Sequence, residues 1–176
     1  MSAPVLIVAG MPGAGKEEFL SVAASMGVPF VRMGDLVRER HAASGSELSL
    51  GEFAGREREA HGQGVWAERS VEKIGPGVFL VDGCRGMSEV RAFRGAGRDA
   101  AIIGIHAPPA ARYARLLERG RADAPRDMAD FEERDARELS WGLGEVLALA
   151  DVMISNGGSL ESFRSEARKV LREEIG

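Results

Sequence analysis

Short apolar runs alternate with longer amphipathic stretches along most of this 176-residue chain. Such runs are typical of strands buried on both faces, and the stretches between them are typical of helical crossovers in a parallel sheet. The runs predict strands at 4–10, 29–33, 77–83, 100–107 and 151–155. The amphipathic stretches predict helices at 16–26, 34–43, 88–95, 108–119 and 159–175.

Two segments are too long to be simple crossovers. Residues 44–75 add a helical excursion after the second strand, and together with the preceding helix they form an insertion that spans 34–75. Residues 120–145 form a highly charged excursion before the fifth strand. A chain of this length is too short for two ordinary domains. We therefore expect a single domain over 1–176, with an acceptor-side insertion at 34–75 and a lid-like segment at 120–145.

The first apolar run leads directly into the sequence GMPGAGKEEF, residues 10–19. Glycines at 10, 13 and 15 allow the backbone N–H groups to turn inward, and together with the following helix N-terminus they form an anion site. Lys16 has the spacing of the lysine that reaches the β- and γ-phosphates of ATP. The predicted ATP-binding residues of this loop are Gly10, Met11, Pro12, Gly13, Ala14, Gly15, Lys16 and Glu17.

Glu17 stands where such loops usually carry a Ser or Thr hydroxyl for magnesium. Its carboxylate has two possible places. It reaches Mg²⁺ directly or through a water, because magnesium accepts carboxylates. Alternatively it faces solvent in the first helical turn, where the helix dipole favours a negative charge.

Composition excludes several classes of function. The net charge of −4 and the pI near 5.5 argue against a nucleic-acid-binding surface. No apolar run approaches the roughly 20 residues that span a bilayer, so we expect no membrane partner. The single cysteine, Cys84, forms no internal disulfide, which fits a reducing compartment, and the three histidines lack metal-site spacing. We expect a cytoplasmic protein.

A Gly-Asp turn at Gly34-Asp35 opens the predicted helix after the second strand, and Arg38 lies one turn inside it. A guanidinium at this place can make a bidentate contact with the phosphate of an acceptor. Arginine alone is modest evidence in this chain, because only three of its 23 basic residues are lysines.

Residues 34–38, Gly-Asp-Leu-Val-Arg, are similar to the start of the monophosphate-binding helix of adenylate kinases, which adds Asp35 to the acceptor side. Residues 79–85, FLVDGCR, resemble the strand that ends in Asp-Gly before an arginine in the same enzymes, with one residue fewer before the arginine. The resemblance implies that Asp82 holds magnesium through its waters. It also implies that Arg85 contacts the transferring or acceptor phosphate.

Arg115 and Arg119 have the four-residue spacing found at the entrance to the lid of adenylate kinases. The resemblance implies that the first packs on adenine and that the second touches phosphate. Arg121 is similar to a catalytic arginine of that lid, and Arg134 and Arg137 are similar to its acceptor-contacting arginines. A solvated, salt-bridged helix also explains much of this charged run.

The C-terminal stretch 149–171 resembles the end of dephospho-coenzyme A kinases, which implies that Asn156 and Gly157 lie beside the adenine ring. Over nearly its whole length the chain resembles archaeal proteins described as adenylate kinase-related or dephospho-coenzyme A kinase-related, a family of unsettled function. That resemblance includes the Lys-Glu-Glu after the loop. It also adds Arg58 as a second acceptor-side arginine.

These features predict a nucleotide kinase-like P-loop NTPase fold, with a doubly wound five-stranded parallel sheet in the order 2-3-1-4-5. The leading interpretation is an enzyme that uses ATP and Mg²⁺ to phosphorylate a small nucleotide-like acceptor, of the nucleoside monophosphate or dephospho-coenzyme A type. One alternative is an ATP-dependent switch or assembly factor without a metabolite acceptor. Another is a degenerate kinase fold that acts as a binding module. The sequence leaves the oligomeric state open.

Overall fold

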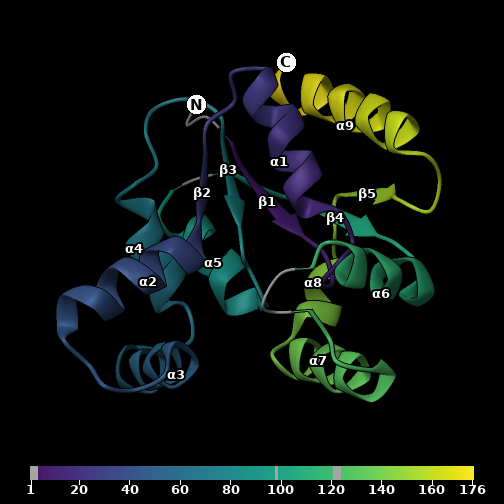
Figure 1. The fold of residues 1–176 in the computed structure, drawn as a ribbon. Coiled ribbons are helices and arrows are strands. Elements are labelled where there is room, and N and C mark those ends of the chain that lie inside the picture. The colour runs from purple at the N-terminus through teal and green to yellow at the C-terminus, as the bar shows by residue number, and fades with distance from the viewer. Residues whose placement is uncertain (1–3, 98, 121–123) are drawn as a thin grey trace.

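The computed structural model describes residues 4–97, 99–120 and 124–176. Its core is one parallel sheet of five strands in the order β2-β3-β1-β4-β5, which confirms the predicted order (Figure 1). The strands are β1 (Val5–Ala9), β2 (Phe30–Arg32), β3 (Phe79–Asp82), β4 (Ala100–His106) and β5 (Val152–Ser155). Within the sheet, Asp82 is paired with Val8 on one side and with Arg32 on the other, so three strand ends meet at one edge.

The helices follow the strands as the amphipathic pattern predicts, with additional short ones in the two excursions. They are α1 (Lys16–Ser25), α2 (Met33–Ser44), α3 (Leu50–His61), α4 (Val65–Val71), α5 (Met87–Gly95), α6 (Pro109–Glu118), α7 (Met128–Ser140), α8 (Leu143–Ala148) and α9 (Leu160–Ile175). The 34–75 insertion therefore holds most of α2 and all of α3 and α4, whereas the 120–145 segment contains α7 and the start of α8. None of the helices within the described residues is long and apolar enough to cross a membrane.

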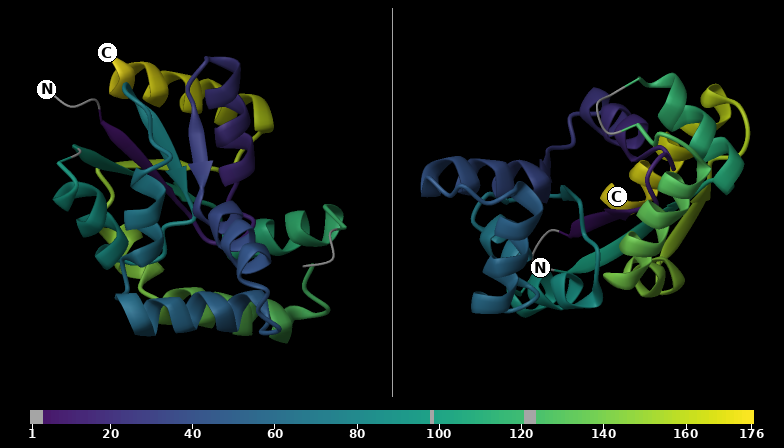
Figure 2. Two further views of the ribbon diagram at one scale, coloured as in Figure 1. Left: turned by 90° about the vertical axis from the view of Figure 1, so that its left-hand side faces the viewer. Right: turned by 60° about the horizontal axis from the view of Figure 1, so that its bottom comes forward.

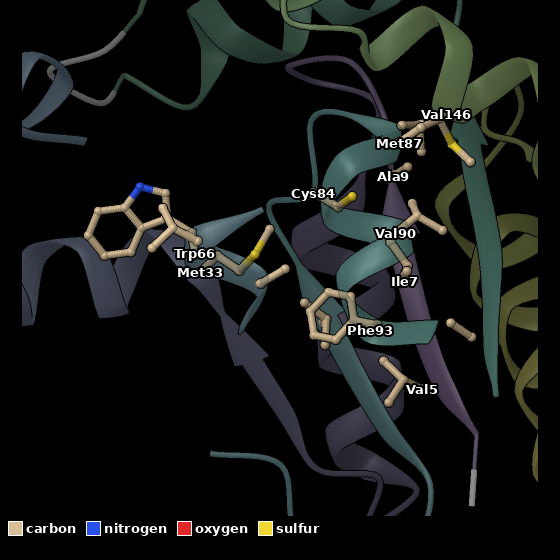
Figure 3. Packing of buried hydrophobic residues seen from close by; sticks show 14 of the residues in the cluster. Val5, Ile7, Ala9, Met33, Trp66, Cys84, Met87, Val90, Phe93 and Val146 are labelled. Carbon is tan, nitrogen blue, oxygen red and sulfur yellow. The ribbon is translucent and has the colours of Figure 1, made fainter. Parts of the chain in front are cut away.

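Each face of the sheet is covered by its own set of helices, because alternate residues of a strand point to opposite faces. Leu6 and Val8 of β1 belong to a cluster with the buried side chains of α1 and α9. Val5, Ile7 and Ala9 face the other cluster, in which Val90 and Phe93 of α5 pack directly against them (Figure 3). All five β1 side chains are buried, so β1 is the centre of the molecule.

The two excursions lie beyond the carboxyl ends of the strands, with α2 and α3 on one side and α7 on the other (Figures 1 and 2). Local capping explains where two of these helices begin. The Ser49 hydroxyl accepts the Glu52 N–H while Glu52 reaches back to the Ser49 N–H, a capping box that starts α3. The Asp127 carboxylate accepts the Asp130 N–H and starts α7. The fold thus brings two helical walls to the edge of the sheet where the glycine loop lies.

Candidate functional site

The loop between β1 and α1 has a backbone that requires glycine. Gly13 and Gly15 have φ values of 80° and 117°, in the left-handed region. A Cβ atom at Gly10 would lie 2.9 Å from the Ile105 carbonyl oxygen, and one at Gly13 would lie 2.8 Å from the Arg112 carbonyl oxygen. A Cβ atom at Gly15 would overlap the Asn156 amide. Backbone and side-chain atoms of other segments therefore pack closely against one side of the loop, and the other side faces the cleft.

Lys16 and Asp82 form a pair of opposite charges at the floor of this cleft. The Lys16 Nζ donates to the Gly10 carbonyl oxygen at 2.6 Å. Desolvation lowers the pKa of Lys16, and the nearby Asp82 carboxylate opposes that shift. Burial raises the pKa of Asp82, and Lys16 in turn opposes it. A partly buried ammonium group and a buried carboxyl group thus lie beside the anion site of the loop.

Asp82 has the chemistry of a magnesium ligand, although no residues form a complete cage. Its Oδ1 atom is buried without a hydrogen-bond partner. Among the described residues, no group of three or more His, Cys, Asp or Glu side chains could hold a metal ion. Magnesium is usually held by one or two carboxylates together with waters and substrate phosphates, so a single unsatisfied carboxylate oxygen fits that ion.

Glu17 lies exposed in the first turn of α1, the second of its two predicted places, and it has an arginine partner there. Its carboxylate accepts a hydrogen bond from Arg32 Nη2 at 2.9 Å, with its side chain about half exposed. Arg32 belongs to β2, and no motif singles it out in the sequence. The Glu17 carboxylate is thus paired with an arginine in this structure, and its contact with Mg²⁺ stays a prediction.

A cleft of about 780 Å³ runs from the glycine loop to the 34–75 insertion. The loop side is lined by Gly10, Pro12, Gly13, Gly15, Lys16, Glu17, Arg115 and Arg119. The opposite side is lined by Val37, Arg38, Leu50, Ala54, Arg58, Trp66 and Arg85. The far side thus combines an apolar wall with three of the arginines that the sequence assigns to the acceptor.

Each of these three arginines is paired with an acid. Arg38 pairs with Asp35, one turn earlier in α2, and Asp35 itself does not line the cleft. Arg58 Nη2 lies 3.5 Å from Glu89, and Arg85 Nε lies 3.3 Å from Glu138. Each guanidinium group of this wall thus has a carboxylate beside it.

Glu89 is a cleft residue that sequence reasoning missed. It is only 2% exposed; its Oε2 accepts the Arg85 backbone N–H at 2.6 Å, and its Oε1 has no hydrogen-bond partner. In the sequence it is one of many acids in a first helical turn, a position that the helix dipole explains without any function. Its burial comes from contacts between distant segments.

The far end of the cleft is formed by α7 and the turn after it. Arg134 and Glu138 of α7 line the cleft, and so does Trp141, whose ring lies 4.6 Å from the Arg85 guanidinium. Arg137 is exposed and does not line the cleft, because it projects from a different part of the helix surface. The predicted catalytic residue Arg121 lies outside the described residues.

Arg112, another residue without a sequence signal, ties α7 to the glycine loop. It is 4% exposed and donates two hydrogen bonds to the Asp135 carboxylate, at 2.9 and 2.5 Å. It also donates to the Pro12 carbonyl oxygen at 3.2 Å, and its guanidinium lies 4.9 Å over the Phe131 ring. The position of α7 is therefore coupled to the loop through one buried side chain.

The residues predicted to surround adenine have a different arrangement. Arg115 lines the cleft, but its Nη2 donates to the Asn156 carbonyl oxygen at 2.8 Å. Asn156 is buried, and its Nδ2 donates to the Ala14 carbonyl oxygen at 2.8 Å. Asn156 thus supports the loop from beneath instead of lining the cleft, since its amide satisfies a buried carbonyl group. Gly157, Met11 and Ala14 do not line the cleft either.

Comparisons with known proteins agree with this architecture. The family model described as an AAA domain matches residues 9–133. A gluconokinase from Sinorhizobium meliloti superposes with a TM-score of 0.64 at 17% identity, covering 98% of this chain and 93% of the other. A shikimate kinase from Bacteroides thetaiotaomicron also gives 0.64, at 16% identity, covering 96% and 98%. At such identities the two structures show the fold alone, that of P-loop kinases.

The curated relatives are much more similar in sequence. UPF0200 protein Ta0179 from Thermoplasma acidophilum is 41% identical over 175 residues, which cover 97% of each chain. The similarity extends through both excursions and the C-terminal helix. The chain therefore belongs to the UPF0200 family, built on a P-loop kinase-like fold.

Proposed function

We propose that this protein transfers the γ-phosphoryl group of ATP, with Mg²⁺, to a small nucleotide-like acceptor. The observation that carries the proposal is the shape of the cleft. It joins the glycine loop and Lys16 on one side to an apolar wall with three arginines on the other. A protein that only hydrolyses ATP has no need of a second substrate wall, whereas a kinase requires one within reach of the γ-phosphate.

On the donor side, the loop N–H groups and Lys16 bind the β- and γ-phosphates. Lys16 then exchanges the Gly10 carbonyl oxygen for a phosphate oxygen, which restores a full negative partner to a desolvated ammonium group. Asp82 is the residue that would hold magnesium, through its unsatisfied Oδ1. The ion would supply positive charge that compensates the negative charge developing on the phosphates during transfer.

On the acceptor side, Arg38, Arg58 and Arg85 provide guanidinium groups for an anionic acceptor. The Leu50 side chain of the same wall, backed by Ala54 and the buried Trp66, provides apolar contact for a ring. A molecule with a phosphate at one end and a base at the other matches both properties. This match favours a nucleotide-like acceptor over a simple sugar.

The third part of the proposal concerns water. Phosphoryl transfer requires that water be excluded from the γ-phosphate, and closing segments commonly do this. Arg119, directly after α6, and Arg134 of α7 line the cleft and add positive charge near the transferring group. We infer that the 120–145 segment closes over ATP.

The proposal is tested by a turnover screen with γ-labelled ATP and Mg²⁺. Acceptors would be nucleoside monophosphates, dephospho-coenzyme A, gluconate and shikimate, the last two suggested by the names of proteins that share the fold. We expect label in one nucleotide-like acceptor, no transfer by Lys16→Ala, and a much lower rate without acceptor. Equal phosphate release with and without every acceptor would contradict the proposal and favour an ATP-dependent switch.

A further inference from the structure

Arg32 adds a further cationic side chain to the part of the cleft beside the glycine loop. It is the last residue of β2 and is paired in the sheet with Asp82. Its side chain is about one third exposed and lines the cleft. Its guanidinium lies 4.8 Å from the centre of the Phe30 ring, which supports one side of the planar group.

Only some of the N–H donors of Arg32 have a hydrogen-bond partner. One N–H group donates to Glu17 at 2.9 Å, and Nε is buried without a partner. A guanidinium has five N–H donors in a fixed fork, which matches the oxygens of a phosphate group. An unpaired buried donor on a charged group is unfavourable, so a shift of Arg32 that brings its guanidinium group onto a ligand oxygen would relieve a cost.

The charges around Arg32 form a compact group. Burial is the main cause that raises the pKa of Asp82; the Glu17 carboxylate adds to it, whereas Lys16 and Arg32 oppose it. Two cations and two carboxylates therefore share the phosphate end of the cleft. The negative charge of Glu17 is compensated by Arg32 before any metal ion arrives.

We propose that Arg32 binds the terminal phosphate oxygens of the nucleotide together with Lys16, and that Glu17 is the residue that positions Arg32. This inference rests on the proposed function, because it assumes a triphosphate at the glycine loop. Glu17 then stabilises ATP binding through an arginine instead of through the metal ion. The unusual glutamate after Lys16 and the arginine at the end of β2 thus act together in binding the phosphate.

The test is a set of calorimetric titrations with ATP, in Mg²⁺ and in excess EDTA. The variants are Arg32→Gln, Glu17→Ala, the double variant and Lys16→Ala. Arg164→Gln is the matched control. Arg164 of α9 donates at 2.6 Å to Glu18, which lies in the same turn of α1 as Glu17, but Arg164 itself does not line the cleft. Thermal melting of each variant establishes that it is folded before titration.

We expect Arg32→Gln to weaken ATP about ten-fold or more in both conditions, the usual effect of losing a charge-assisted contact. Glu17→Ala should weaken ATP in both conditions, because Arg32 is no longer held. The double variant should be no weaker than Arg32→Gln, since both changes act on one contact. Arg164→Gln should bind as the wild type does.

Three results would overturn the inference. ATP affinity unchanged by Arg32→Gln would remove Arg32 from the phosphate site. A loss in Glu17→Ala that occurs only with Mg²⁺ would make Glu17 a metal ligand. Tighter metal-free binding by Glu17→Ala would show that its negative charge repels the triphosphate. Unchanged affinity in Lys16→Ala would contradict the proposed function itself, so the two failures are distinguishable.

Discussion

Asp82 shows how one buried side chain links stability to function. Burial raises its pKa, so the folded protein holds the Asp82 proton to a higher pH than the unfolded chain does. In the interval between the two pKa values the folded state binds more protons, and the free energy of unfolding falls as pH rises. The ionised form of Asp82 is thus a stability cost, carried by a side chain with the chemistry of a magnesium ligand.

Asp82→Asn is predicted to remove this pH dependence, because asparagine does not titrate. The free energy of unfolding of the variant, relative to wild type, should increase as pH rises from below the ordinary aspartate pKa through the raised one. Urea denaturation at a series of acid pH values measures the difference. Parallel curves for the two proteins would show that Asp82 titrates normally.

Of the three loop glycines, Gly15 leaves the least room for a Cβ atom. Gly15→Ala should destabilise the protein and abolish ATP binding, because the new Cβ would overlap the Asn156 amide that holds the loop. Gly27→Ala is the matched control: Gly27 also has positive φ, at 75°, but a Cβ there meets nothing within 4 Å. The control should lose only the roughly 1–2 kcal/mol of left-handed strain. Similar melting temperatures in both variants would mean that the overlap is relieved by local movement.

The sequence is informative about single residues where the signal is local. Glycine spacing and the adjacent strand are enough to predict the loop and Lys16, because turn geometry depends on neighbouring residues. The partners of the charged residues cannot be predicted from such local signals. Arg32 with Glu17, and Arg112 with Asp135, join segments that are 15 and 23 residues apart, and only packing selects them among the many acids and arginines of this chain.

Among the elements, α7 is held by a buried ion pair that makes it more than a solvated charged helix. The side chains of Arg112 and Asp135 are 5% and 17% exposed. Removing one partner of a buried pair leaves the other charge without compensation, which costs more than the pair itself contributes. The helix that lines the far end of the cleft thus depends on a contact at the glycine loop.

Asp135→Asn is predicted to lower the free energy of unfolding by about 3 kcal/mol, because Arg112 would remain buried with a neutral partner. Arg126→Gln serves as the control, since Arg126 pairs with Asp130 on the same helix but is 84% exposed. Surface pairs contribute little, so this variant should be nearly as stable as wild type. Denaturant unfolding of the two variants checks the difference, and equal losses would contradict it.

The regular elements could be predicted because apolar runs and amphipathic periods reflect burial on the two faces of a parallel sheet. All five strands fall within the predicted ranges. Beyond the predicted helix at 34–43, the sequence indicates the two excursions only as a helical segment at 44–75 and a highly charged one at 120–145. The boundary between α7 and α8 depends on Gly142, which has a φ of 102° and separates the charged α7 from the largely apolar α8.

In the whole molecule, the cleft lies beyond the carboxyl ends of the strands, between the 34–75 insertion and α7. Trp66 belongs to the insertion and is fully buried, whereas Trp141 belongs to the opposite wall and is 47% exposed. The two tryptophans therefore report on different events. Movement of the walls toward each other changes the surroundings of Trp141 and leaves those of Trp66 almost unchanged.

Closure over ATP is predicted to change the tryptophan fluorescence of the wild type, because Trp141 lies against Arg85 in the cleft wall. Trp141→Phe should abolish most of this change while ATP still binds, as calorimetry would verify. Trp66→Phe, if folded, should retain it. A signal that persists in Trp141→Phe would place the movement elsewhere in the molecule.

The support of the glycine loop by Asn156 has a consequence for the order of events during synthesis. The amide of Asn156 bonds to Ala14, 142 positions earlier in the chain, and β5 pairs only with β4 at the edge of the sheet. Domains begin to fold while the ribosome is still extending the chain. The loop is translated among the first residues, but its support emerges near the end. A nascent chain that stops before β5 would carry the complete loop sequence and still fail to capture nucleotide, so ATP retention would report that translation has been completed.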